Sequence, residues 1–430
     1  MSAELAAVAA HGAELAVHGA EWTTKEFFSY PNEFVYWTIQ IVMYPYITGL
    51  VAGAFVLSSL YHVFGQEDLK DIAKFALVFS FALLIVAPMP LLFHLQQPQR
   101  NFEVMFTPHF TSAIAAFGMV YSFYMAIVAA EIWFVYRKFF VEQAIALKEA
   151  KGIYNKLLGK LYKILTLGAN DISEEALHTD HKLVKYLAAL GIPVACFLHG
   201  YAGFIFGSVK ANALWTTPLM PVIFIMSAIV SGIALCMLTD IIMMEWRKFR
   251  IKHSKKNFHM TADEVVGEEV AVTKKTSKFL LGAMVAAIVL ELLDLIFRGY
   301  TATKSWDILR TVIYDMDFTK IFIMQYGIGN ALPFIMLLLP GLTVRRAAIA
   351  SALVLFGVFM MRWNVVIGGQ AFSNSFAGFM HYHMPIIPHN AETFKEGLFG
   401  ALFMGGLPFV LFWMFNKVVP SVKYTLKEKL

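Results

Sequence analysis

The chain alternates between long apolar stretches and shorter polar connections. A helix needs roughly 20 apolar residues to cross a bilayer core of about 30 Å. Nine stretches meet this requirement: about 35–64, 72–94, 110–136, 183–207, 217–245, 277–299, 321–340, 345–368 and 396–417. This pattern predicts an all-α, polytopic transmembrane protein with about nine spans, although eight or ten spans are also compatible with it.

Composition supports this class and excludes others. Of the 430 residues, 58% are hydrophobic and only 15% are charged, and the mean hydropathy is +0.62. Soluble domains carry about 25% charged residues, so a water-soluble enzyme is excluded. Two cysteines, Cys196 and Cys236, are too few for a disulfide framework or an iron–sulfur cluster held by this chain.

The distribution of lysine and arginine predicts the orientation. Connections 65–74, 137–185, 246–278 and 341–346, together with the C-terminal tail, collect 26 of the 35 basic residues. Basic connections remain in the cytoplasm. We therefore expect a multi-pass protein of the prokaryotic cytoplasmic membrane, with its N-terminus outside and its C-terminus inside.

Four segments follow from the pattern of spans. Residues 1–34 form an extracytoplasmic segment, and residues 35–245 hold the first five spans. Residues 246–276 form a cytoplasmic loop that begins basic and becomes acidic, a pattern that favours contact with anionic lipid. Residues 277–430 hold the remaining spans and the cytoplasmic tail.

Histidine placement argues against heme. The deep histidines, His62, His94 and His199, lie on three different spans, so no span carries two. We expect no heme and no metal on this chain. Nucleotide-binding loops and zinc-protease signatures are also missing from the sequence, and nothing suggests nucleic-acid binding.

Several polar side chains converge near the outer ends of the first, second and fourth spans. Imidazole, phenol and carboxamide groups beside apolar walls suit a quinone ring, whose oxygens exchange hydrogen bonds and protons. The alternative is that these groups only bond neighbouring helices. The candidates for quinone binding are Gln40, Tyr44, His94, Gln97, His199 and Tyr201.

A second set of ionisable residues lies in the sixth and eighth spans. Glu291 and Asp294 are three residues apart on one helix face, and Arg362 lies at a similar depth. Ionisable groups inside a membrane usually pair with one another or line a functional path. The sequence leaves both readings open, a structural ion pair or a route for proton transfer.

At this point the sequence resembles a known family. The run Leu198-His199-Gly200-Tyr201-Ala202-Gly203-Phe204 and the later Ser231-Gly232-Ile233-Ala234 resemble motifs of the NrfD/PsrC family, the membrane subunits of polysulfide reductase and related complexes. The second span ends His94-Leu95-Gln96-Gln97-Pro98-Gln99-Arg100, similar to the family's Asp-Leu-Gly-x-Pro-x-Arg. Here His94 replaces the acid and Gln96 replaces the glycine. The HGYAGFIFG stretch is most similar to the DsrP/HmcC-like branch.

The resemblance implies two helical bundles without a redox metal of their own. It also implies menaquinone or a related quinone near the outer face, a ferredoxin-like iron–sulfur subunit docked there, and further redox subunits. Tyr201 falls on the family's quinone-contacting tyrosine, and Gln40 and Tyr44 fall in its first-helix contact region. The implied role is quinone exchange within a respiratory oxidoreductase of sulfur or sulfate type, with no catalysis by this chain alone.

Two alternatives remain from the residues. Gly327, Gly329 and Pro333 interrupt the seventh span around Asn330, as happens in secondary transporters. A bare membrane anchor without quinone is the other alternative, and it predicts that His199 is dispensable.

Overall fold

The computed structural model describes residues 35, 37–109, 111–149, 152–210, 212–253, 262–301, 305–371, 380 and 382–421. These residues form helices and no strand. Nine of their helical segments are long and apolar enough to cross a bilayer, which confirms the expected fold class. The predicted N-terminal segment, the centre of the 246–276 loop and most of the C-terminal tail lie outside the described residues.

The first five spans begin with α2 (Ile39–His62) and the broken pair α3 (Lys70–Val86) and α4 (Met89–His94). They continue with α6 (Ala113–Ala146), α8 (Glu174–Gly207) and α9 (Met220–His253). The last four spans are α10 (Ala262–Thr301), η5 (Thr319–Ala331) with α12 (Leu332–Leu338), α13 (Val344–Val366) and α15 (Leu398–Val418). Short helices fill the connections: η2 (Glu67–Leu69), η3 (Pro98–Arg100), α5 (Glu103–Phe106), α7 (Ile153–Leu165), α11 (Ser305–Arg310), η4 (Thr311–Met316), η6 (Gly368–Gln370) and α14 (Ala391–Glu396).

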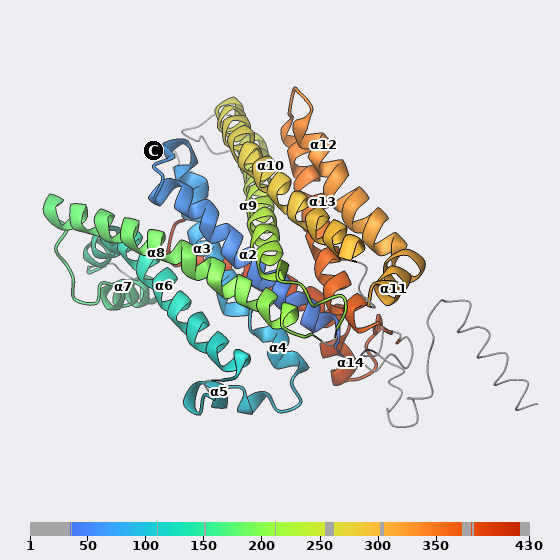
Figure 1. Ribbon diagram of the computed structural model, residues 1–430. Helices are drawn as coiled ribbons and strands as arrows, with labels where there is room; N and C mark the ends of the chain where they lie inside the picture. Colours follow the sequence, from blue (N-terminus) through green and yellow to red (C-terminus); the bar gives the residue numbers. More distant parts are fainter. Residues whose placement is uncertain are drawn as a thin grey trace, which may run out of the picture.

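Helices α2, α3 and α9 occupy the middle of the molecule. Figure 1 shows α6, α7 and α8 on one side of them and α10, α12 and α13 on the other. Helix α13 packs on both α9 and α2, and α15 returns to α3, so the last spans are joined closely to the first. We call the end at which α2 begins and α8 ends the Gln40 end of the molecule.

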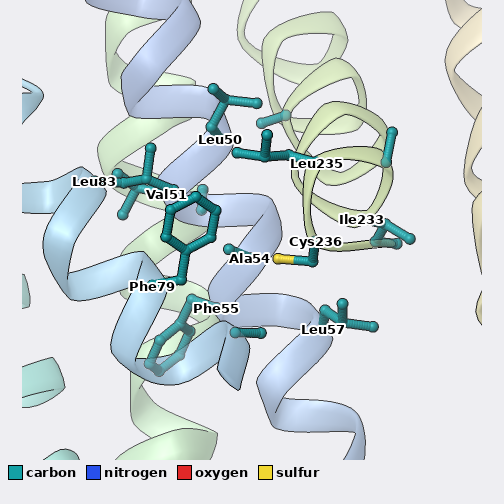
Figure 2. Close-up of a cluster of buried hydrophobic side chains, with 14 of the residues drawn as sticks. Leu50, Val51, Ala54, Phe55, Leu57, Phe79, Leu83, Ile233, Leu235 and Cys236 are labelled. Carbon is teal, nitrogen blue, oxygen red and sulfur yellow. The ribbon is translucent and has the colours of Figure 1, made fainter. Parts of the chain in front are cut away.

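The core between α2, α3 and α9 consists of tightly packed apolar side chains. Phe55 of α2, Phe79 of α3 and Cys236 of α9 are all fully buried in this core (Figure 2). Helices α2 and α9 approach most closely where Gly53 faces Gly232, since a Cβ on either residue would overlap the other helix. Small residues are the usual means of bringing membrane helices together without a solvent-driven hydrophobic effect.

Proline explains the break in the second span. Pro88 has no N–H with which to bond the carbonyl of Leu84 one turn earlier, so the helix ends there and α4 continues in a new direction. Tyr121 of α6 donates its hydroxyl to the Leu84 oxygen and so satisfies it. The break carries His94 to the Gln40 end.

The seventh span is wound as a π-helix over Thr319–Ala331 before it becomes α-helical. The sequence indicated an interruption here from Gly327, Gly329 and Pro333. The π-helix is rare and is frequently found at functional sites.

Candidate functional site

Arg362 is the largest fully buried side chain among the described residues and forms the centre of the site. Its Nη2 donates to the hydroxyl of Ser227 at 2.6 Å and to the backbone oxygen of Phe224 at 3.4 Å. Its guanidinium carbon lies 3.8 Å from the centre of the Phe224 ring, a cation–π contact. The charge is therefore held by dipoles and an aromatic face.

His199 of α8 is the second member of this centre. Its Nε2 lies 2.9 Å from Nη2 of Arg362. Arginine only donates hydrogen bonds, so Nε2 must accept and the proton of the neutral imidazole must be on Nδ1. Nδ1 of His199 and Nε of Arg362 are buried and have no hydrogen-bond partner among the described residues. The centre thus holds two unused donors.

The neighbouring helices make room for this pair. Gly49 of α2 faces the imidazole, and a Cβ at this position would lie 3.1 Å from Cε1 of His199. On the other side the ring stacks on Phe224, with centroids 5.6 Å apart. His199 is thus held between a glycine and an aromatic ring.

Tyr44 and Tyr201 lie together against one aromatic side chain. Phe117 of α6 meets Tyr44 edge-on, with centroids 5.7 Å apart, and is stacked with Tyr201 at 6.3 Å. Tyr44 is buried and Tyr201 is half-buried. The structure therefore brings together two of the predicted residues, one from α2 and one from α8.

His94 and Gln40 form a separate corner at the Gln40 end, built around α14. Nδ1 of His94 lies 3.1 Å from a carboxylate oxygen of Glu396, which also accepts from the hydroxyl of Thr38. The amide of Gln40 donates to the backbone oxygen of Lys395, while its Oε1 is buried without a partner among the described residues. This corner ties the start of α2 to the segment before α15.

Electrostatics at this corner favour the ionised carboxylate. Burial raises the pKa of Glu396, but hydrogen bonds from His94 and Thr38 and the charges nearby outweigh it, so the pKa lies below its ordinary value of 4.5. Burial also raises the pKa of Tyr382 to about 12, and its hydroxyl accepts from the N–H of Ile39. Both residues hold the first turn of α2.

Gln97 lies apart from the other predicted residues. It is exposed in the turn after α4, where its Oε1 accepts from Arg100 at 3.2 Å. The structure does not bring it to His199. Quinone contact by any of the six predicted residues stays a prediction.

The structure divides the predicted set of Glu291, Asp294 and Arg362, since no ion pair links Arg362 to either acid among the described residues. Within the described residues, Asp294 pairs with Arg298 at 2.8 Å, one helical turn away on α10, and Glu291 accepts from Gln325 at 3.0 Å. Arg362 donates to His199 instead. The cation that pairs with Asp294 is Arg298, which lies on the same helix. Proton transfer through Glu291, Asp294 and Arg362 stays a prediction.

A different buried pair was missed. Nδ1 of His62 lies 3.4 Å from Glu131, and both side chains are almost fully buried between α2 and α6. The sequence did not predict this pair, because the two residues lie on different spans. Helix α6 continues to Ala146, which leaves Glu131 well inside the helix.

The partners of the central pair were also missed. Ser227 and Phe224 lie in an ordinary apolar run of α9, and Glu396, the partner of His94 in the other corner, lies in a connection. The sequence contained one indication of this pair, because His199 and Arg362 lie at a similar depth on their two spans. Among the described residues, no group of three or more metal-ligating side chains gathers.

These features define a multi-pass helical membrane protein with a buried histidine–arginine centre near one end. Residues 29–374 match the family described as Polysulphide reductase, NrfD, so this chain belongs to the NrfD family.

Three curated relatives are similar to the chain. It is 35% identical over 201 residues to a selenate reductase subunit of Mesobacillus selenatarsenatis, and the match covers 46% of each protein. It is 26% identical to a putative dimethyl sulfoxide reductase membrane subunit of Halobacterium salinarum, over 77% of this chain and 69% of the relative. It is 27% identical to Protein NrfD of Escherichia coli, over 48% of this chain and 60% of the relative. The matched region spans about half the length of the selenate reductase protein.

Proposed function

We propose that this chain is the quinone-reactive membrane subunit of a respiratory oxidoreductase complex. The observation that carries the proposal is the pair of buried, unused donors, Nδ1 of His199 and Nε of Arg362. A buried donor without a partner costs about 1–3 kcal/mol, and a carbonyl oxygen is the acceptor that removes this cost. Quinone rings carry two such oxygens.

The chain's own residues would bind and orient the ring. His199 donates from Nδ1, while Arg362 fixes the imidazole through Nε2 and leaves it neutral. In this arrangement His199 supplies a proton or hydrogen bond to a quinone oxygen. It accepts a quinol proton only when the bond to Arg362 breaks. Tyr44 and Tyr201 offer hydroxyls beside the aromatic wall of Phe117.

The bound quinone supplies the redox chemistry, since quinol oxidation releases two electrons and two protons. The sequence predicts no metal on this chain, so a partner must take the electrons. We propose a ferredoxin-like iron–sulfur subunit, as the resemblance implies, docked at the Gln40 end on the outer face of the cytoplasmic membrane. The relatives' names, which mention selenate reductase and dimethyl sulfoxide reductase, support anaerobic respiration of this general type. We further propose menaquinone as the quinone and a sulfur or sulfate pathway.

Purification of the tagged chain from its native membrane in mild detergent tests this function. We expect an iron–sulfur protein to copurify and dithionite-reduced quinol to reduce its clusters. The His199→Leu variant should keep the partner and lose cluster reduction, because leucine suits a buried helix but donates nothing. A chain that purifies without any redox partner, or a His199→Leu complex with wild-type cluster reduction, would refute the proposal.

A further inference from the structure

A cavity between α9, α10, η5 and α13 lies apart from the six residues proposed to bind quinone. It has a volume of about 110 Å³, and its polar lining includes Glu291, Gln325 and Asn364. These three form a chain, in which Asn364 donates to Gln325 at 2.8 Å and Gln325 donates to Glu291 at 3.0 Å. The π-helical winding of η5 places Gln325 and Tyr326 at this cavity.

The cavity offers acceptors to a ligand. Oδ1 of Asn364 is buried and has no hydrogen-bond partner among the described residues, and Glu291 adds its carboxyl oxygens. Of the described residues that line the cavity, Arg298 is the only cation, and it is bound to Asp294 and to the backbone oxygen of Ala213. A ligand that fits must therefore donate hydrogen bonds and carry no negative charge.

A second, apolar cavity of about 480 Å³ adjoins the first, and the two share Leu295 and Tyr326. Its lining is apolar apart from Tyr326 and Asn330. Val289 and Leu292 in this lining are nearly half exposed on the outer surface of α10, where a membrane protein meets hydrocarbon. The two cavities together have the form of a polar head pocket with a groove for a tail.

We propose that these cavities bind a lipid hydroquinone, with its hydroxyls on Glu291 and Asn364 and its isoprenoid tail in the apolar groove. The reduced ring donates two hydrogen bonds, which matches the acceptors here, whereas the oxidised ring only accepts, which matches the donors at His199. An anionic phospholipid is disfavoured because the described lining of the head pocket holds two acids and a single, already paired arginine. The inference concerns binding only, and it stands on the cavities even if the proposed function at His199 fails.

Photo-cross-linking tests the assignment on the full-length protein in nanodiscs. The probe is a naphthohydroquinone with a diazirine on a ten-carbon tail, kept reduced under anaerobic conditions and compared with its oxidised form. We expect the reduced probe to label the stretches 285–295 and 319–334 at least fivefold more strongly than the oxidised probe. Glu291→Gln replaces an acceptor-only group with one that also donates, so we expect about tenfold weaker labelling. Glu142→Gln, on an exposed acid of α6, should leave labelling unchanged.

A steric variant makes the test independent of hydrogen bonding. Leu295→Trp fills the junction of the two cavities and should remove most of the label, whereas Leu293→Trp, on the exposed face of α10, should not. The label should persist in His199→Leu, which separates this inference from the proposed function. Equal labelling by the two probe forms, retention of the label in Leu295→Trp, or displacement of the label by added phosphatidylethanolamine but not by unlabelled hydroquinone would overturn it.

Discussion

Replacing Gly49 by alanine tests the geometry of the central pair with the smallest available change. The new Cβ would lie 3.1 Å from Cε1 and 3.2 Å from Nε2 of His199, and 3.5 Å from Cβ of Ala228. The two contacts with His199 are too close for a carbon atom, so one neighbour must move by a few tenths of an ångström. The imidazole of His199 is the neighbour most easily displaced, and any displacement brings it closer to Phe224 and Arg362.

Two opposing effects set the expected magnitude. Alanine stabilises a helix by about 0.5–1 kcal/mol relative to glycine, while overpacking a tight contact costs about 1–3 kcal/mol. The net loss of stability should be about 0–2.5 kcal/mol by these figures. A weakened bond between His199 and Arg362 costs about 1 kcal/mol, so the affinity for an oxidised quinone should fall about fivefold to tenfold.

The assay is the Kd of a short-chain naphthoquinone, with the Tm measured on the same sample. Gly406→Ala is the matched control, because no atom lies within 4 Å of its added Cβ and it makes the same change in the middle of α15. Gly406→Ala should not alter the Kd. An unchanged Kd in Gly49→Ala would show that the position of the imidazole does not govern quinone binding.

The remaining predictions concern two pairs of ionisable groups. His62→Leu should lower stability by about 1–3 kcal/mol because it leaves the buried carboxyl group of Glu131 without its nearest polar neighbour, and the double change to leucine at both positions should recover most of the lost Tm. Equal Tm in the single and double variants would argue against pairing. The lowered pKa of Glu396 stabilises the fold above its ordinary value of 4.5, and this contribution is lost as the pH falls through the lowered value. The protection factors of residues 391–396 against hydrogen exchange should therefore fall on acidification below about pH 4.5 in the wild type and not in Glu396→Gln. The same fall in both proteins would contradict this role.

Much of the fold was predictable because hydropathy is a strong signal in a membrane. The nine spans were found from apolar runs, and their charged flanks explain why the structure extends several helices beyond the expected bounds. Helix α6 continues to Ala146 through Arg137 and Lys138, since charged residues can extend a helix once it has left the hydrocarbon. Hydropathy detects the apolar part only.

The site was predicted less completely because contacts across helices depend on rotation about each axis. Depth alone placed Arg362 beside Glu291 and Asp294, but a side chain points in one direction, and that of Arg362 reaches His199. Tyr44 and Tyr201 both contact Phe117, because both lie near the same end of adjacent helices. Glu396 could not be found, since its position depends on a loop that returns from the far end of the sequence.

Binding of an oxidised quinone to the purified protein tests the central claim most directly. The wild type should bind a short-chain naphthoquinone, and the His199→Leu variant should bind it at least tenfold more weakly while keeping a Tm close to that of the wild type. An unchanged Kd in a well-folded His199→Leu protein would contradict the account.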